Sequence, residues 1–260
     1  MKGREILTKY SMQCSNCRCR KYYRHLLVFT LLIPISASFA INDYNGTLLT
    51  TIITKNHIYL SSDGIAVDSR TDEIISIDLS KVHKISDSVG VLIGGIWIHD
   101  FDAQIKESRE FEELSDVVSV ANAVEQILKQ AWEKLKSKKD RRMFVLIVGY
   151  DKNKSPRLFY IDSQQHFLIN ERKLFQDSEI NVELCIMPHK NSIPNDWKLL
   201  RDYIKNERKI NPNNIHQCMI NAFSSLAKDY SKVDDHIGGT IFYLILNQPH
   251  NTKAFFFNGN

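Results

Sequence analysis

Apolar and polar positions over residues 47–64 follow the pattern of a β-hairpin. Two runs rich in β-branched and aromatic residues flank the polar dipeptide Lys55-Asn56, which can form a two-residue turn, although a weaker one than Asn-Gly. Pairing about this turn brings Thr47 level with Asp63 and Gly64. The pattern therefore predicts that a hydroxyl and a carboxylate are neighbours at one end of the hairpin.

Hydrophobic periodicity in the rest of the chain predicts strands, two helices, strands, two helices and a last strand. Residues 65–76 form a polar connection. Further strands are predicted at Ile77–Ile85, Val89–Gly95, Met143–Tyr150, Arg157–Asp162, Ile180–Met187 and Gly238–Leu246. Apolar spacings of three and four predict helices at Ile98–Glu110, Val117–Leu135, Trp197–Glu207 and Ile215–Tyr230. This order predicts an α+β fold, built as a four-layer αββα sandwich.

The first 40 residues have the three parts of a secretory signal peptide. A basic stretch over residues 1–25 precedes the apolar run Leu26–Ile35 and the small-residue run Ser36–Ala40. The apolar run is too short for a comfortable membrane span. We expect export, to a periplasm or outside the cell; an uncleaved anchor, which would make the membrane a partner, is the alternative. Met12 is an alternative start.

Removing this leader reverses the charge balance. The whole chain has a formal net charge of +4, but the leader holds 7 of the 34 Lys+Arg and 1 of the 30 Asp+Glu, which leaves 27 against 29. No basic stripe remains, so we expect no nucleic-acid partner.

The leader also contains three of the five cysteines, Cys14, Cys17 and Cys19. Their spacing lacks a fourth ligand, so we expect no metal site there. Cys185 and Cys218 remain in an exported chain, and the sequence does not decide whether they pair.

Gly46-Thr47 is a candidate catalytic junction. If that bond were cut, Thr47 would carry both a hydroxyl nucleophile and an α-amine with an unperturbed pKa of about 7.7–8.0. The amine could then act as the general base for its own hydroxyl. Such a centre also needs a cation, an anion that holds the cation, and backbone donors for the oxyanion. In an uncut chain, Thr47 is an ordinary strand threonine.

Five segments, in order, resemble the proteasome β-subunit and HslV family of N-terminal nucleophile (Ntn) hydrolases. They are Gly46-Thr47, His57–Gly64, Lys81–Ile85 with Gly90–Gly95, Gly149–Asp151 with Pro156–Asp162, and Asp234–Gly239. The resemblance covers nearly all of residues 46–246. It implies a propeptide over residues 41–46 and a single domain over residues 47–260.

The resemblance implies a threonine protease made as a zymogen and activated by autocatalytic cleavage. Its residue roles are Thr47 as nucleophile and base, Lys81 as cation, Asp63 as the anion that orients Lys81, Gly94 or Gly95 as oxyanion donor, and Asp234 as a supporting acid. It implies a peptide or unfolded-protein substrate and no metal or organic cofactor. No ring interface can be identified in the sequence, so a homo-oligomer stays open.

Three departures from the family pattern keep other functions open. Ile65 stands where many members have arginine, Ile237 replaces a serine, and residues 183–189 stand where a Gly-Ser-Gly is usual. The missing serine and the missing Gly-Ser-Gly favour a catalytically inactive scaffold or binding protein as the alternative, and a non-peptidase amidase is a third hypothesis. A second frame would make Thr50 the nucleophile and Asp68 its partner. We prefer Thr47 because glycine precedes it and its spacing to Asp63 needs no gap.

Overall fold

The computed structural model describes residues 41–260, apart from residues 43, 46, 69–70, 72, 96, 99–100, 111, 136–141, 176–179, 188–196, 249–254 and 260. For residues 41–45, 97, 184–187 and 255–259 it describes the backbone alone. The predicted leader and its three cysteines lie outside the described residues. None of the described helices is both long and apolar enough to cross a membrane.

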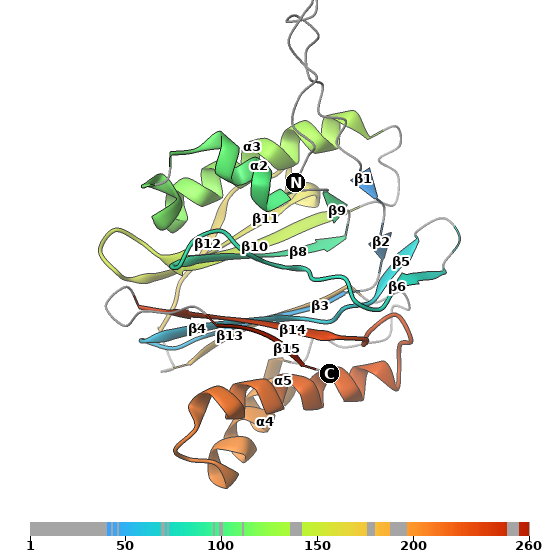
Figure 1. Cartoon of the computed structure of the whole chain (residues 1–260), viewed down its shortest axis with the longest axis vertical. Coiled ribbons are helices and arrows are strands. Elements are labelled where there is room, and N and C mark those ends of the chain that lie inside the picture. Colours follow the sequence, from blue (N-terminus) through green and yellow to red (C-terminus); the bar gives the residue numbers. More distant parts are fainter. Residues whose placement is uncertain are drawn as a thin grey trace, which may run out of the picture. The chain divides into compact units, whose positions relative to one another are not determined.

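Two five-stranded antiparallel sheets form the centre of the fold (Figure 1). In spatial order, the first contains β12 (Asn170–Arg172), β11 (Pro156–Asp162), β10 (Met143–Tyr150), β8 (Val89–Gly95) and β7 (Val82–Lys84). The second contains β13 (Asn181–Met187), β3 (Thr47–Ile53), β4 (His57–Ser62), β14 (Ile241–Asn247) and β15 (Phe255–Gly259).

Two small sheets lie at the end of the fold where β3 begins. One pairs β1 (Ile41–Asn42) with β9 (Trp97–Ile98), and the other contains β2 (Tyr44–Asn45), β5 (Ala66–Asp68) and β6 (Ile74–Ser76). Both involve residues immediately before Thr47.

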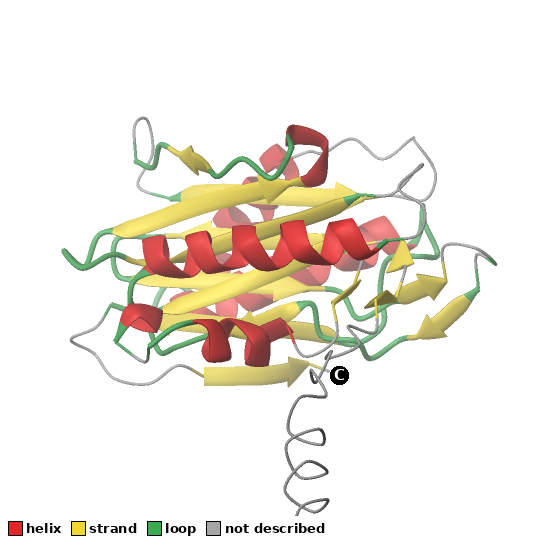
Figure 2. Ribbon diagram, turned by 90° about the horizontal axis from the view of Figure 1, so that it is seen from above, coloured by secondary structure: helices red, strands yellow, loops and turns green. Residues whose placement is uncertain are grey.

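In the described part of the chain, four α-helices cover the outer faces of the two large sheets. They are α2 (Phe101–Ser108), α3 (Val117–Lys134), α4 (Trp197–Ile210) and α5 (Ile215–Ser231), and there are short 3₁₀ turns at Glu113–Ser115 and Ser163–Gln165. Helices α2 and α3 pack on the first sheet, and α5 with α4 packs on the second (Figures 1 and 2). The predicted α+β class, with antiparallel sheets, is confirmed.

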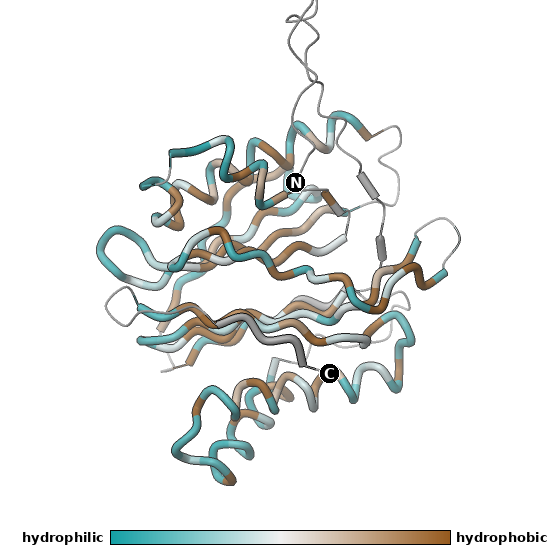
Figure 3. Tube along the Cα trace, viewed as in Figure 1, coloured by the Kyte–Doolittle hydropathy of each residue, from teal (hydrophilic) through white to brown (hydrophobic). Residues whose placement is uncertain are grey.

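Side-chain alternation explains why the central strands are apolar throughout. Along β10, Val145 and Ile147 face the α2–α3 side, whereas Leu146 and Val148 face the second sheet. The same alternation in β3 places Leu49 between the sheets and Leu48 under α5. Hydrophobic positions accordingly mark both large sheets in Figure 3. Both faces of each sheet are buried, which favours continuous apolar runs.

The predicted β3–β4 hairpin is confirmed in register. Ile53 pairs with Ile58 and Leu49 with Ser62. At the turn, the amide of Thr54 donates to the His57 carbonyl at 2.9 Å. Lys55-Asn56 is therefore the two-residue turn, and continuing the same register places Thr47 level with Gly64.

Four boundary predictions were wrong. Residues 65–76 contain β5 and β6, in which Asp68 and Ser76 are the polar positions. Only Val82–Lys84 of the predicted strand Ile77–Ile85 is extended, because the preceding residues turn to meet Gly64 and Thr240. Ile98 belongs to β9, so α2 begins at Phe101. The last core strand begins at Ile241, since the positive φ angles of Gly238 and Gly239 form a loop.

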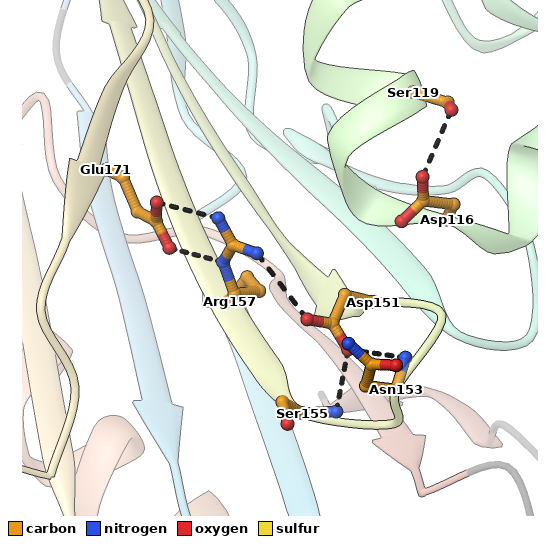
Figure 4. A network of polar contacts seen from close by, with 7 residues as sticks. All are labelled: Asp116, Ser119, Asp151, Asn153, Ser155, Arg157 and Glu171. Atoms are coloured by element: carbon orange, nitrogen blue, oxygen red, sulfur yellow. Dashed lines mark hydrogen bonds and ion pairs between the residues drawn. The ribbon is translucent and has the colours of Figure 1, made fainter.

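The β10–β11 hairpin closes in a polar turn (Figure 4). The Asp151 carboxylate accepts from the amides of Asn153 at 2.8 Å and Ser155 at 3.0 Å. Arg157 joins Asp151 to Glu171 on β12. These contacts stabilise the turn end of the hairpin. There β8 pairs with β10.

Candidate functional site

Asp63 and Lys81 form a buried ion pair beside the start of β3. The Lys81 Nζ lies 2.6 Å from the Asp63 Oδ1, and the side chains are 5% and 0% exposed, respectively. Eighteen residues separate them in sequence. Asp63 directly follows β4 and Lys81 directly precedes β7, so the ion pair joins the two large sheets.

Backbone amides complete the surroundings of the Asp63 carboxylate. The amide of Leu48 donates to Oδ1 at 2.9 Å, and the amide of Gly238 donates to Oδ2 at 3.3 Å. The Asp63 amide in turn donates to the Leu48 carbonyl at 3.1 Å. Asp63 is therefore hydrogen-bonded to both backbone groups of the residue that follows Thr47.

Thr47 is buried at the first position of β3. Strand alternation places its side chain on the same face of β3 as Leu49, which packs between the sheets. In the full chain, the Thr47 nitrogen is a peptide amide; the free amine of the expected mechanism would arise only by cleavage after Gly46.

The backbone also brings Lys81 close to the predicted oxyanion glycines. Ile93 donates its amide to the Lys81 carbonyl at 3.0 Å, and Val82 pairs with Leu92. Gly94 and Gly95 follow on β8, where they pair with Phe144 and Met143 of β10. Gly95 has a φ of 82°, a left-handed backbone conformation that glycine adopts without strain.

Asp234 shapes the loop that reaches Asp63 from the helix side. Its buried Oδ1 accepts from the amide of His236 at 2.9 Å. Two residues further on, Gly238 donates its amide to Asp63, and its carbonyl accepts from the amide of Gly64 at 2.9 Å. The described contacts place Asp234 at the start of the loop whose Gly238 contacts Asp63.

Burial and charge act in opposite directions on the ion pair. Desolvation raises the pKa of the Asp63 carboxyl, while the Lys81 charge and the amides of Leu48 and Gly238 oppose that rise. Desolvation also lowers the pKa of Lys81, and the Asp63 charge opposes that fall. Each residue therefore depends on the other to remain charged.

The second nucleophile frame has a different setting. Thr50 is fully buried in the middle of β3, where it pairs with Ser61 and Leu184. Asp68 lies on β5, in the small three-stranded sheet, and accepts from the amide of Thr71 at 3.4 Å. The structure groups Lys81 with Asp63, the acid of the first frame.

The departures from the family pattern take up apolar space. Ile237 is 1% exposed and belongs to the core beneath α4 and α5, while Ile65 is 6% exposed. Only part of the segment that replaces Gly-Ser-Gly is described, and it forms part of β13.

Cys218 is a free, buried thiol that donates to the Asn211 carbonyl. The Cys185 side chain lies outside the described part of the chain.

The segment before Thr47 was not recognised as structured from the sequence. Tyr44 and Asn45 of β2 pair with Asp68 and Val67 of β5. Ile41 and Asn42 of β1 pair with Ile98 and Trp97 of β9. These strands are only two residues long and pair with distant segments, so no local periodicity could have revealed them. The amides of Leu48 and Gly238 were also missed; the Gly238-Gly239 pair was the only signal for the latter.

Comparison with known proteins adds no assignment: no protein-family model matches the chain, and neither does any curated protein.

Proposed function

We propose that this chain is a threonine-type Ntn hydrolase, a peptidase in its substrate class, activated by cleavage between Gly46 and Thr47. The proposal includes membership of the proteasome β-subunit and HslV family and the four-layer αββα sandwich of that family. The observation that carries it is the buried Asp63–Lys81 ion pair, hydrogen-bonded to the residue after Thr47.

The proposed activation uses the same atoms as later turnover. The Thr47 hydroxyl attacks the Gly46 carbonyl carbon, the C–N bond breaks, and the Thr47 nitrogen leaves as an amine that takes up the hydroxyl proton. The resulting ester is hydrolysed by water to a Gly46 carboxylate and a restored Thr47 hydroxyl. In turnover, the free amine accepts the hydroxyl proton, a peptide carbonyl replaces Gly46, and the acyl-enzyme is hydrolysed in the same way.

The surrounding residues supply charge and donors. Lys81 stabilises negative charge that develops on the Thr47 oxygen, and Asp63 holds Lys81 in position. The amide of Gly94 or Gly95 is the proposed oxyanion donor. No step requires a metal or organic cofactor. The leader supports an exported enzyme that acts on peptides or unfolded proteins.

The alternative is an inactive scaffold or binding protein with the same fold. Burial of Ile237 in the core favours it, because the position offers no hydroxyl to support the nucleophile. A non-peptidase amidase would use the same centre on a different substrate.

The test is the intact mass and N-terminal residue of the purified full chain. We expect wild type and Thr47→Ser to begin at residue 47, Thr47→Ala to remain longer, and Thr50→Ala to be cut like wild type. A wild-type chain that begins near Ile41 with Thr47 internal would support the scaffold. A start at Thr50 would transfer the mechanism to the second frame. Hydrolysis of a denatured test protein by the processed chain then distinguishes a peptidase from an amidase.

A further inference from the structure

We infer that residues 41–46 stay bound after cleavage and inhibit the enzyme as a retained product. This inference rests on the proposed function. The starting observation is that the segment before Thr47 pairs with two strands that lie next to the site in sequence. Strand β5 begins three residues after Asp63, and β9 begins two residues after Gly95.

In both pairings the segment occupies a backbone edge of a strand, β9 or β5. Cleavage after Gly46 does not by itself break these pairings. Among the described residues, β1 is the strand that pairs with β9, and β2 covers the side of β5 opposite β6. Figure 1 shows β1 beside β9 and β2 beside β5. Loss of the segment would leave backbone donors and acceptors of both edges without their strand partners, and such edges pair readily with an extended chain.

Cleavage also creates opposite charges at the break. Gly46 gains a carboxylate, and Thr47 gains an amine that is partly protonated near neutral pH. Attraction between the new ends adds to the strand pairing, so the cut segment keeps its contacts with β5 and β9. A substrate must then displace it. The segment therefore acts as a competitive inhibitor until it dissociates or is diluted.

Residues 41–46 are held by two backbone pairings, and a matched pair of variants tests the pairing between β2 and β5. Tyr44→Pro/Asn45→Pro removes both amide hydrogens of β2, whereas Tyr44→Ala/Asn45→Ala changes the same side chains and keeps them. Each is made in the uncut Thr47→Ala chain. We expect amide exchange at Val67, which pairs with Asn45, to be at least about fivefold faster with the prolines than with the alanines. The Asp68 amide donates to the Glu73 carbonyl instead, so its exchange is not the readout. Equal exchange would overturn the pairing, whether or not the chain is an enzyme.

The second measurement uses the processed wild-type chain and a synthetic peptide of residues 41–46. Native mass spectrometry is expected to detect this segment on the freshly processed chain. After its removal by dilution and filtration, activity on a denatured test protein should rise, and added peptide should inhibit competitively and slow exchange in β5 and β9. The peptide with prolines at positions 44 and 45 should do neither.

The outcomes separate the two claims. A chain that is never cut at Gly46-Thr47 defeats the proposed function, and retention with it. A chain that is cut and active, but is unaffected by the peptide in both activity and exchange, defeats retention alone. Inhibition by the unchanged peptide and the proline peptide alike would show that strand pairing is not the basis of inhibition.

Discussion

The Lys81 ammonium lies 2.6 Å from the Asp63 carboxylate, and the surrounding side chains bury both groups. Removal of one partner from such a pair leaves a charge in a low-dielectric site. We expect Asp63→Asn, made in the uncut Thr47→Ala chain, to lose about 3–5 kcal/mol of unfolding free energy, measured by urea denaturation. In an otherwise wild-type chain, the same change should abolish cleavage at Gly46-Thr47, measured by intact mass.

An exposed ion pair provides the matched control. Lys84 and Asp87 are also 2.6 Å apart, but Asp87 is 89% exposed. Asp87→Asn should cost less than about 1 kcal/mol, because exposed pairs contribute little, and should leave cleavage intact. Similar losses of unfolding free energy for Asp63→Asn and Asp87→Asn would contradict the conclusion that burial makes the Asp63–Lys81 pair important for stability.

The hairpin carrying this site was predictable because its signals are local. Side-chain alternation and a polar dipeptide fixed the β3–β4 register, and that register alone placed Asp63 near Thr47. The Asp63–Lys81 pair was different, since it joins residues of two sheets. Its prediction came from the family resemblance, because periodicity contains no information on which charged residues meet between sheets.

Elements that depend on distant partners were missed. Strand β12 has the sequence Asn-Glu-Arg, which has no strand propensity of its own, and it forms by pairing with β11. Strands β1 and β2 depend similarly on β9 and β5. The helix α3 was predicted to within one residue because its apolar stripe repeats over the whole element.

The loop from Asp234 to Gly238 allows charge and geometry to be tested separately. Asp234→Asn keeps an acceptor for the amide of His236, whereas Asp234→Ala removes it. If Asp234 acts by positioning Gly238 against Asp63, the asparagine variant should be processed at nearly the wild-type rate. The alanine variant should be processed at least about tenfold more slowly, a loss of about 1.4 kcal/mol in barrier terms. The measurement is the time course of intact mass; equally slow variants would instead assign the role to the charge.

Gly64 has no room for a side chain. A Cβ there would lie 2.6 Å from the Thr240 carbonyl oxygen and 2.7 Å from that of Ile77. Both neighbours are backbone, so relief requires movement of the loop beside Asp63. We expect Gly64→Ala to cost about 2–3 kcal/mol in urea denaturation and to slow cleavage.

Gly90→Ala is a control for added volume. Its Cβ would meet Leu244 Cδ2 at 2.9 Å and the methyl groups of Leu60, which are flexible side-chain ends. We expect Gly90→Ala to lose about 1 kcal/mol of unfolding free energy and to be cleaved normally. A larger loss of stability for Gly90→Ala than for Gly64→Ala would contradict the idea that the backbone carbonyls around Gly64 leave no room for a side chain.

Acid sensitivity should arise from His83, whose side chain on β7 is 12% exposed. Burial lowers its pKa from 6.5 to about 4; the nearby Asp102 raises it and Lys106 lowers it. Between these pH values the unfolded chain binds more protons than the folded chain, so stability falls as the pH falls. The shift of about 2.5 units corresponds to a loss of about 3 kcal/mol between pH 6.5 and pH 4.

Urea denaturation of the uncut Thr47→Ala chain across this pH range measures the effect. His83→Gln keeps a polar side chain but cannot titrate, so its stability should depend less on pH by about 3 kcal/mol over the window. The exposed His166 provides the control, as His166→Asn suits its left-handed backbone, with a φ of 55°. Because this variant removes a histidine without touching the β7 site, its pH profile should follow that of the parent chain. Parallel profiles for His83→Gln and the parent would exclude His83 as the acid-sensitive group.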